Sequence, residues 1–372
     1  MKKILKTIII NLLVLIALLM IVDFSSMIIV DTATASRVVR NKLIPQTPKK
    51  QDVRSVLINY KHTSWAKTHF EEFNSLPTDY KSYFGWRRKK YKGETINIDS
   101  LGIRKTTGIT QINAPLVVFL GGSTIWGTGA NDQNTIPSLF KKKTGNSYNV
   151  LNYGESGYSA YQSLIFLQTQ ISKGLLDSIS LIISYDGVNN SFFNRKYFSH
   201  TREVQINNLL HNQNSDEKYL FFKYTRTLIK KIKSKYNSPP PVLNPTTNFT
   251  DIDYKNCAIE LLNTWVMMQN LSKSVGSDFI CVLQPNIFVG SPNLNNLPNS
   301  KDLHNRKKSY EFYKYINELI STKDEYKQLK KSFIDMTTTL DNIPNVYIDF
   351  CHLSPNGNEL ITDNLLNYLE IK

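Results

Sequence analysis

The residues of this chain that could do chemistry lie in four short segments, each of which follows an apolar run. The segments are Gly121-Gly122-Ser123-Thr124, Asn152 to Gly157, Asp186 to Asn190, and Asp349-Phe350-Cys351-His352. Serine, histidine and aspartate act together in acyl transfer, where a base activates the nucleophile and a carboxylate orients the base. Ser123 is the candidate nucleophile, His352 the candidate base, and Asp349 the candidate orienting group.

Acyl transfer also needs hydrogen-bond donors for the oxyanion that develops on the substrate. The candidates for this oxyanion hole are the backbone N–H groups of Ser123 and Gly157 and the side-chain amide of Asn189. The other histidines do not follow a strand signal with a carboxylate three residues earlier, so we expect them to be structural. They are His62, His69, His200, His211 and His304.

These residues can act together only if the four segments meet, and the apolar patterning from residue 115 onward predicts a fold in which they do. Strand-like apolar runs alternate with helical patterns, which indicates an α/β fold with a doubly wound parallel sheet. In such a sheet, sites form at the shared carboxyl edge of the strands. The expected strands are 116–120, 148–152, 179–184, 278–284 and 346–349, and the expected helices are 134–143, 160–171, 257–275 and 355–369.

The four segments, in this order, resemble the blocks of the SGNH/GDSL hydrolase family, which centre on a serine, a glycine, an asparagine and a D-x-x-H pair. The matching residues are Ser123, Gly157, Asn189, and Asp349 with His352. The resemblance covers residues 115–372 apart from an insertion at 191–250. It implies a flavodoxin-like three-layer α/β/α sandwich and a serine esterase or acyltransferase that works through an acyl-enzyme.

Two positions depart from the family's blocks. The usual Gly-Asp-Ser is Gly121-Gly122-Ser123 here, and the usual final aspartate of G-x-N-D is Asn190. Both replaced acids are supporting groups in the family, so the departures concern loop geometry more than chemistry. A literal Asp99-Ser100-Leu101 has no apolar strand before it, and we expect it to have no catalytic role.

The cysteine pattern predicts neither a metal site nor a disulfide-rich scaffold, because Cys257, Cys281 and Cys351 are few and scattered. We expect Cys351 to be a packed free thiol. A Cys257–Cys281 disulfide would be compatible with export. No H-E-x-x-H, paired C-x-x-C or phosphate-loop motif occurs, so no cofactor is expected.

The N-terminal region has the pattern of a membrane anchor. Lysines precede an apolar stretch from Ile4 to Val22, close to the length that spans a bilayer. Ala33-Thr34-Ala35 could be a signal-peptide cleavage site, but it lies far beyond the apolar run. We therefore favour an uncleaved single-pass anchor over residues 1–36, with the larger C-terminal part exported.

The formal net charge of +15 is concentrated outside the four segments. Residues 37–92 hold 14 basic and four acidic side chains, and residues 191–240 hold ten and three. We interpret 37–110 as a basic, aromatic stalk with short strands. The pattern at 216–236 predicts an amphipathic helix, either packed on the domain with solvated lysines or acting as a lid or membrane-facing element.

The charge has several explanations, of which nucleic acid is the least favoured because no nucleic-acid-binding motif accompanies it. The remaining explanations of the positive charge are contact with anionic lipid, contact with an acidic glycan, and a lysine-rich genome without any such partner. The expected function is that of a membrane-anchored, extracytoplasmic serine esterase with a hydrolase domain at 111–372, acting on an acylated surface glycan. The alternatives are an O-acyltransferase using the same residues, a lipid esterase, and a non-catalytic binding or assembly protein.

Overall fold

The computed structural model describes residues 2–43, 51–174, 179–192, 223–236, 250–295, 297 and 306–371. The chain divides into two compact units. One comprises Met1–Lys50 with Ser199–Thr247, and the other comprises Gln51–Phe198 with Asn248–Lys372. The second, larger unit contains all the candidate site residues.

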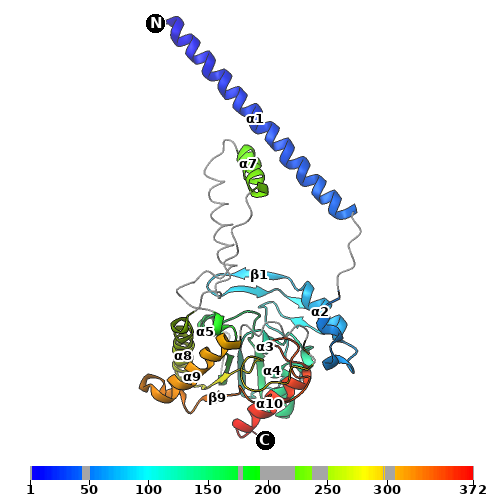
Figure 1. The fold of residues 1–372 in the computed structure, drawn as a ribbon, viewed down its shortest axis with the longest axis vertical. Helices are drawn as coiled ribbons and strands as arrows, with labels where there is room; N and C mark the ends of the chain where they lie inside the picture. The colour runs from blue at the N-terminus through cyan, green and yellow to red at the C-terminus, as the bar shows by residue number, and fades with distance from the viewer. Residues whose placement is uncertain are drawn as a thin grey trace. The chain divides into compact units, whose positions relative to one another are not determined.

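A five-stranded parallel sheet forms the centre of the larger unit (Figure 1). Its strands, in spatial order, are β6 (Asn149–Asn152), β5 (Leu116–Gly121), β7 (Ile179–Asp186), β8 (Asp278–Leu283) and β9 (Phe333–Asp335). The chain passes from β5 outward to β6 and then crosses back to β7. The strand order therefore reverses between β5 and β7, which is where sites form in open parallel sheets.

Helices cover both faces of this sheet, so the expected three-layer α/β/α architecture is confirmed. Along β5, Val117 and Phe119 face one helical layer, whereas Val118 and Leu120 face the other, as the two-residue period of a strand requires. One layer consists of α4 (Ile136–Lys143), α10 (Pro355–Tyr368) and the single turn α3 (Ser123–Trp126); the other consists of α5 (Ala160–Ser172), α8 (Asp251–Ser274) and α9 (Arg306–Thr322).

The helices that frame the site begin at side-chain caps that the sequence supplies. Thr135 accepts the N–H of Ser138 at the start of α4, and Ser354 accepts the N–H of Gly357 at the start of α10. A capping box of Ser159 with Gln162 starts α5. Each cap satisfies backbone donors that would otherwise lack a partner at the helix end.

The predicted fifth strand at 346–349 is wrong. The fifth strand is β9, whose three residues are too few to show a period. The chain at 346–354 instead forms a tight antiparallel loop, in which Ile348 N–H donates to His352 O at 2.9 Å and Ser354 N–H donates to Val346 O at 2.8 Å. This loop carries Asp349 and His352.

The predicted stalk at 37–110 differs from the structure, because residues 51–110 pack against the sheet domain. Tyr60 Oη donates to Gly129 O at 2.6 Å, and Asn59 donates to the carbonyls of Asn345 and Tyr347. The short strands expected there do form. They are β1 (Thr78–Lys81) with β2 (Gly85–Arg88), and β3 (Tyr91–Lys92) with β4 (Asn97–Ile98), and helix α2 (Ala66–Ser75) precedes them. The expected domain start at residue 111 is therefore too late.

The smaller unit pairs α1 (Lys2–Leu43) with α7 (Lys223–Tyr236). Within α1, Lys2–Ala33 is long and apolar enough to span a membrane, a test that a signal sequence would also pass. Both the N–H and the hydroxyl of Thr225 donate to Asp23 of α1, at 2.8 and 2.9 Å. The start of the predicted helix, 216–222, lies outside the described residues.

Candidate active site

Ser123, His352 and Asp349 lie together in a hydrogen-bonded line at the carboxyl edge of the sheet. His352 Nε2 is 2.7 Å from Ser123 Oγ, and His352 Nδ1 is 2.6 Å from Asp349 Oδ2. A histidine held in this way can take the serine proton at Nε2 while Nδ1–H remains bonded to the carboxylate. The spacing fits a nucleophile, a base and an orienting group.

The turn that presents Ser123 depends on Gly121, the last residue of β5. Gly121 has φ +150°, and a Cβ there would lie 2.5 Å from Tyr185 O on the neighbouring strand. The chain can therefore leave the strand sharply and start α3 at Ser123. Because α3 is a single turn, its dipole is small, and the donors that matter are individual N–H groups.

The 349–352 loop fixes the carboxylate of Asp349 through its own backbone. Asp349 Oδ1 accepts the N–H of His352 at 2.8 Å and the N–H of Cys351 at 3.1 Å. Burial alone would raise the pKa of Asp349, but the adjacent His352 ring and these two N–H groups lower it to about 2. The carboxylate is thus ionised at neutral pH and available to hold Nδ1–H of His352.

The structure brings the other two segments to the same turn. Gly157 has φ +77° with open space where a Cβ would project, and its N–H has no hydrogen-bond partner among the described residues. Asn189 Nδ2 donates to Tyr158 O at 2.8 Å and lies 2.5 Å from where a Cβ of Gly122 would stand. The second Nδ2 proton of Asn189 remains available for a substrate oxygen.

A buried ion pair that the sequence analysis missed supports the Gly157 loop. Glu155 is 2% exposed, pairs with the guanidinium of Arg88, and accepts the N–H groups of Arg88 and Ser156 at 3.0 and 2.8 Å. The N–H of Glu155 donates to Gly121 O at 3.1 Å. The pair therefore ties the β5 turn to the loop that carries Gly157.

A second buried arginine holds the far end of α3. Arg104 Nη1 donates to the carbonyls of Trp126 and Gly127, and its Nε donates to Asp132 at 3.0 Å. Two guanidinium groups lie over the ring of Trp126, with Arg88 Cζ at 4.1 Å and Arg104 Cζ at 4.4 Å from its centre. No strand or helix period marks these arginines, so only the structure reveals them.

An aromatic pair borders the base. Phe350, 39% exposed, stacks on Phe288 with ring centres 6.0 Å apart and presents its ring to His352 at 6.4 Å. An exposed aromatic ring beside a nucleophile offers apolar area to an acyl or leaving group.

The cysteines are free buried thiols. The disulfide considered for Cys257 and Cys281 is therefore absent. Burial raises the pKa of Cys351 well above its ordinary value, and so does the nearby Asp349, which does not favour a thiolate nucleophile. Donor atoms of Asp349, Cys351 and His352 lie within 4.8 Å of one another, but both ring nitrogens of His352 are already engaged by Asp349 and Ser123.

The remaining expectations concern polar groups away from the triad. His69 is buried, with Nε2 2.9 Å from Thr128 O, and burial, the largest cause, together with Arg104 lowers its pKa to about 3. Asp99, of the literal Asp-Ser-Leu, accepts the N–H groups of Leu101 and Ile103 in a turn. His62 is exposed. Three other histidines, His200, His211 and His304, lie outside the described residues.

No protein-family model matches this chain, and no curated protein matches it. Several solved structures are similar to it. They include a carbohydrate acetylesterase family member from Sinorhizobium meliloti (13% identity, TM-score 0.40, 69% of this chain and 97% of that one), and an aryl esterase from M. smegmatis (11%, 0.39, 69% and 99%). Another is a protein described as lipolytic and of the G-D-S-L family from Desulfitobacterium hafniense DCB-2 (13%, 0.37, 68% and 98%). At such low similarity their activities do not transfer to this chain.

Proposed function

We propose that this protein is an SGNH-type serine hydrolase that cleaves an O-acyl ester. The observation that carries the proposal is the continuous Ser123–His352–Asp349 line, with contacts of 2.7 and 2.6 Å. Its supports are the ionised Asp349 and the nearness of Gly157 and Asn189 to the serine turn. The three residues come from two segments that are far apart in sequence, and they lie in the order that acyl transfer needs. Chance packing gives no reason for that order.

In the first half of the reaction, Ser123 Oγ attacks the acyl carbonyl carbon while His352 Nε2 takes the hydroxyl proton. The carbonyl oxygen becomes an oxyanion, which accepts hydrogen bonds from the N–H groups of Ser123 and Gly157 and from Asn189 Nδ2. Collapse of this intermediate breaks the ester bond. His352 then gives its proton to the departing alcohol, which leaves the acyl group on Ser123.

In the second half, water attacks the acyl-enzyme and His352 accepts a proton from it. A second oxyanion forms in the same hole and collapses, which breaks the bond to Ser123 Oγ and releases the carboxylic acid, while His352 returns its proton to Ser123 Oγ. If a sugar hydroxyl replaced this water, the same residues would carry out O-acyl transfer. Hydrolysis and transfer therefore differ only in the nucleophile admitted to the acyl-enzyme.

The substrate and location proposed here are an acylated surface glycan and the outer side of a membrane. The apolar helix α1 supports single-pass anchoring through its length and composition. The glycan preference follows from the family that the four segments resemble, since its extracytoplasmic members modify surface polysaccharides. The exposed Phe350 beside the base suits an acyl group or the apolar face of a sugar ring.

A fluorophosphonate probe, which labels activated serines, tests the nucleophile. We expect the full-length protein in detergent to be labelled and Ser123→Ala to lose the label. Ser100→Ala is the matched control, because Ser100 lies in the literal Asp-Ser-Leu turn and should leave labelling unchanged. Equal labelling of wild type and Ser123→Ala would overturn the assignment. Product analysis with an acetylated sugar, with and without a sugar acceptor, then separates hydrolysis from transfer.

A further inference from the structure

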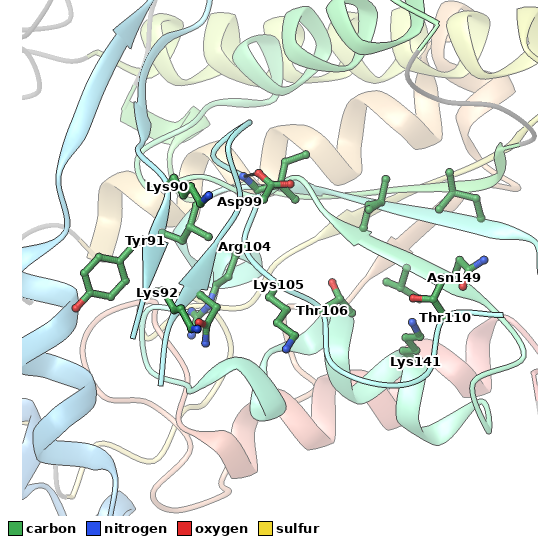
Figure 2. A pocket seen from close by; sticks show the side chains of 16 residues that line it. Lys90, Tyr91, Lys92, Asp99, Arg104, Lys105, Thr106, Thr110, Lys141 and Asn149 are labelled. Atoms are coloured by element: carbon green, nitrogen blue, oxygen red, sulfur yellow. Dashed lines mark hydrogen bonds between the residues drawn. The ribbon is translucent and has the colours of Figure 1, made fainter. Parts of the chain in front are cut away.

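A basic pocket lies along the edge strand β6 and reaches the first residue of β5. It has a volume of about 490 Å³, within the range of small-molecule sites of about 300–1,000 Å³. Figure 2 shows its lining side chains, which come from β3, β4, the segment 103–110, α4, and the first residues of β5 and β6. Measured from Leu116, the lining residue on β5, the triad lies beyond the other end of the strand, about 17 Å away at about 3.3 Å per residue.

The lining of the pocket is strongly cationic. Four lysines take part, and among the described residues none of their ammonium groups forms an ion pair; they are Lys90, Lys92, Lys105 and Lys141. Arg104 also lines the pocket but is committed to Asp132 and to backbone carbonyls. The acidic group in the lining is Asp99, whose Oδ1 accepts two backbone N–H groups.

Lys141 is the least exposed of the four lysines. It is only 3% exposed, and burial lowers its pKa. Its neighbours on α4 behave differently, since Lys142 is exposed and Lys143 pairs with Glu359 and Asp363 at 3.1 and 2.7 Å. Its stem is packed, with Cδ and Cε beside Gly108, while the ammonium group reaches the pocket without an acidic partner and can donate charge-assisted hydrogen bonds to an anion there.

Uncharged groups beside the lysines suit a hydroxylated ligand. The hydroxyl Oγ1 of Thr106 is buried and has no hydrogen-bond partner among the described residues. In Figure 2 it lies between Lys105 and Lys141. Ile98, Leu116 and Leu151 add apolar lining, against which the C–H face of a sugar ring can pack.

We propose that this pocket binds an anionic sugar, with its phosphate or carboxylate on Lys141, Lys105 and Thr106. The phosphate or carboxylate supplies a negative partner for the ammonium group of Lys141, and its oxygens can accept a hydrogen bond from the hydroxyl of Thr106. Charge-assisted hydrogen bonds of this kind are each stronger than neutral ones. The site is separate from the triad and does not depend on ester hydrolysis.

Isothermal titration of the full-length protein in detergent tests the site with three probes: glucose 6-phosphate, galacturonic acid and neutral glucose. We expect the two acidic sugars to bind and glucose to bind at least about tenfold more weakly, because one charge-assisted contact is worth about that factor. A preference between the two acids identifies phosphate or carboxylate as the source of the charge.

Lys141→Met keeps the buried stem and removes the charge, so it should weaken binding of the acidic sugars about tenfold or more. Lys142→Met, which removes an exposed charge from the same helix, should leave binding unchanged. If Lys141→Met does not fold, Lys105→Gln on the exposed rim serves instead. Equal binding by the pocket variant and Lys142→Met, or equally tight binding of glucose, would overturn the proposal. Ser123→Ala should bind the acidic sugars as the wild type does, because the pocket is separate from the triad. Failure of the sugar-binding proposal would therefore leave the hydrolase proposal unchanged.

Discussion

Gly122 stands where the SGNH family, which the four segments resemble, usually has an aspartate before the serine, and the structure gives a steric reason for the glycine. A Cβ at this position would lie 2.5 Å from Asn189 Nδ2 and 3.4 Å from Tyr158 O. The amide of Asn189 therefore occupies the space that a side chain at residue 122 would need. The glycine at position 122 and the position of Asn189, the proposed oxyanion donor, therefore depend on each other.

Gly122→Ala should lower kcat for ester hydrolysis about 10²-fold, because displacing one oxyanion donor costs about that much. Alanine can adopt the backbone φ of −85° at Gly122, so the added Cβ acts through its contact with Asn189 Nδ2 and not through backbone strain. Asn189→Ala should give a similar loss, and the double variant should lose little more, since both changes remove the same donor. Fully multiplicative losses would contradict this coupling. Steady-state kinetics with a chromogenic acetate ester measures all three variants.

The candidate catalytic residues could be found from sequence patterns, whereas the residues that hold them in place could not. Ser123 and Asn189 each follow a strand signal, and Asp349 with His352 carries its own three-residue spacing. The supporting ion pair joins Arg88 to Glu155, 67 positions away, and no local period reveals such a partner. In a basic segment, a buried arginine and a solvated one look alike in sequence.

At the scale of elements, two arginines and a carbonyl-rich turn determine where α3 sits. Arg104 is fully buried and contacts Trp126, Gly127 and Ala130 through their carbonyls, as well as Asp132. These contacts fix the C-terminal end of the turn whose first residue is Ser123. The longer strands and helices were predictable because their apolar residues span several periods; β9 was not, because three residues show none.

Arg104→Met should reduce the free energy of unfolding by about 3–5 kcal/mol, because it leaves Asp132 buried without its partner. Lys81→Met is the matched control. It breaks the Lys81–Asp79 pair, whose side chains are 47% and 46% exposed, and should change stability by no more than about 0.5 kcal/mol. Urea unfolding of the full-length chain in detergent measures both. Equal effects of the two substitutions would show that Arg104 does not hold the fold together.

At the scale of the whole molecule, the basic excess divides between different roles. Arg88 and Arg104 are structural, buried beside Trp126, whereas Lys90, Lys92 and Lys105 line the basic pocket. The sequence located the charge correctly but assigned residues 51–110 to a stalk. The sequence shows where charged residues lie along the chain, but whether they are buried depends on contacts with segments far away in sequence.

Helix α1 has 42 residues, which span about 63 Å at about 1.5 Å per residue, twice the hydrocarbon thickness of about 30 Å. From Ile8 to Val22 the segment is apolar except for Asn11, and Asp23, which follows it, bonds to Thr225 of α7. We expect the helix to cross the membrane before Asp23 and to continue beyond it, with α7 beside that second part.

The full-length chain should then stay in membranes after alkaline extraction and keep Met1 by mass spectrometry. Leu12→Arg with Leu15→Arg should release it, whereas Ile28→Arg with Ile29→Arg should not. A soluble chain beginning at Ser36 would instead identify a cleaved signal.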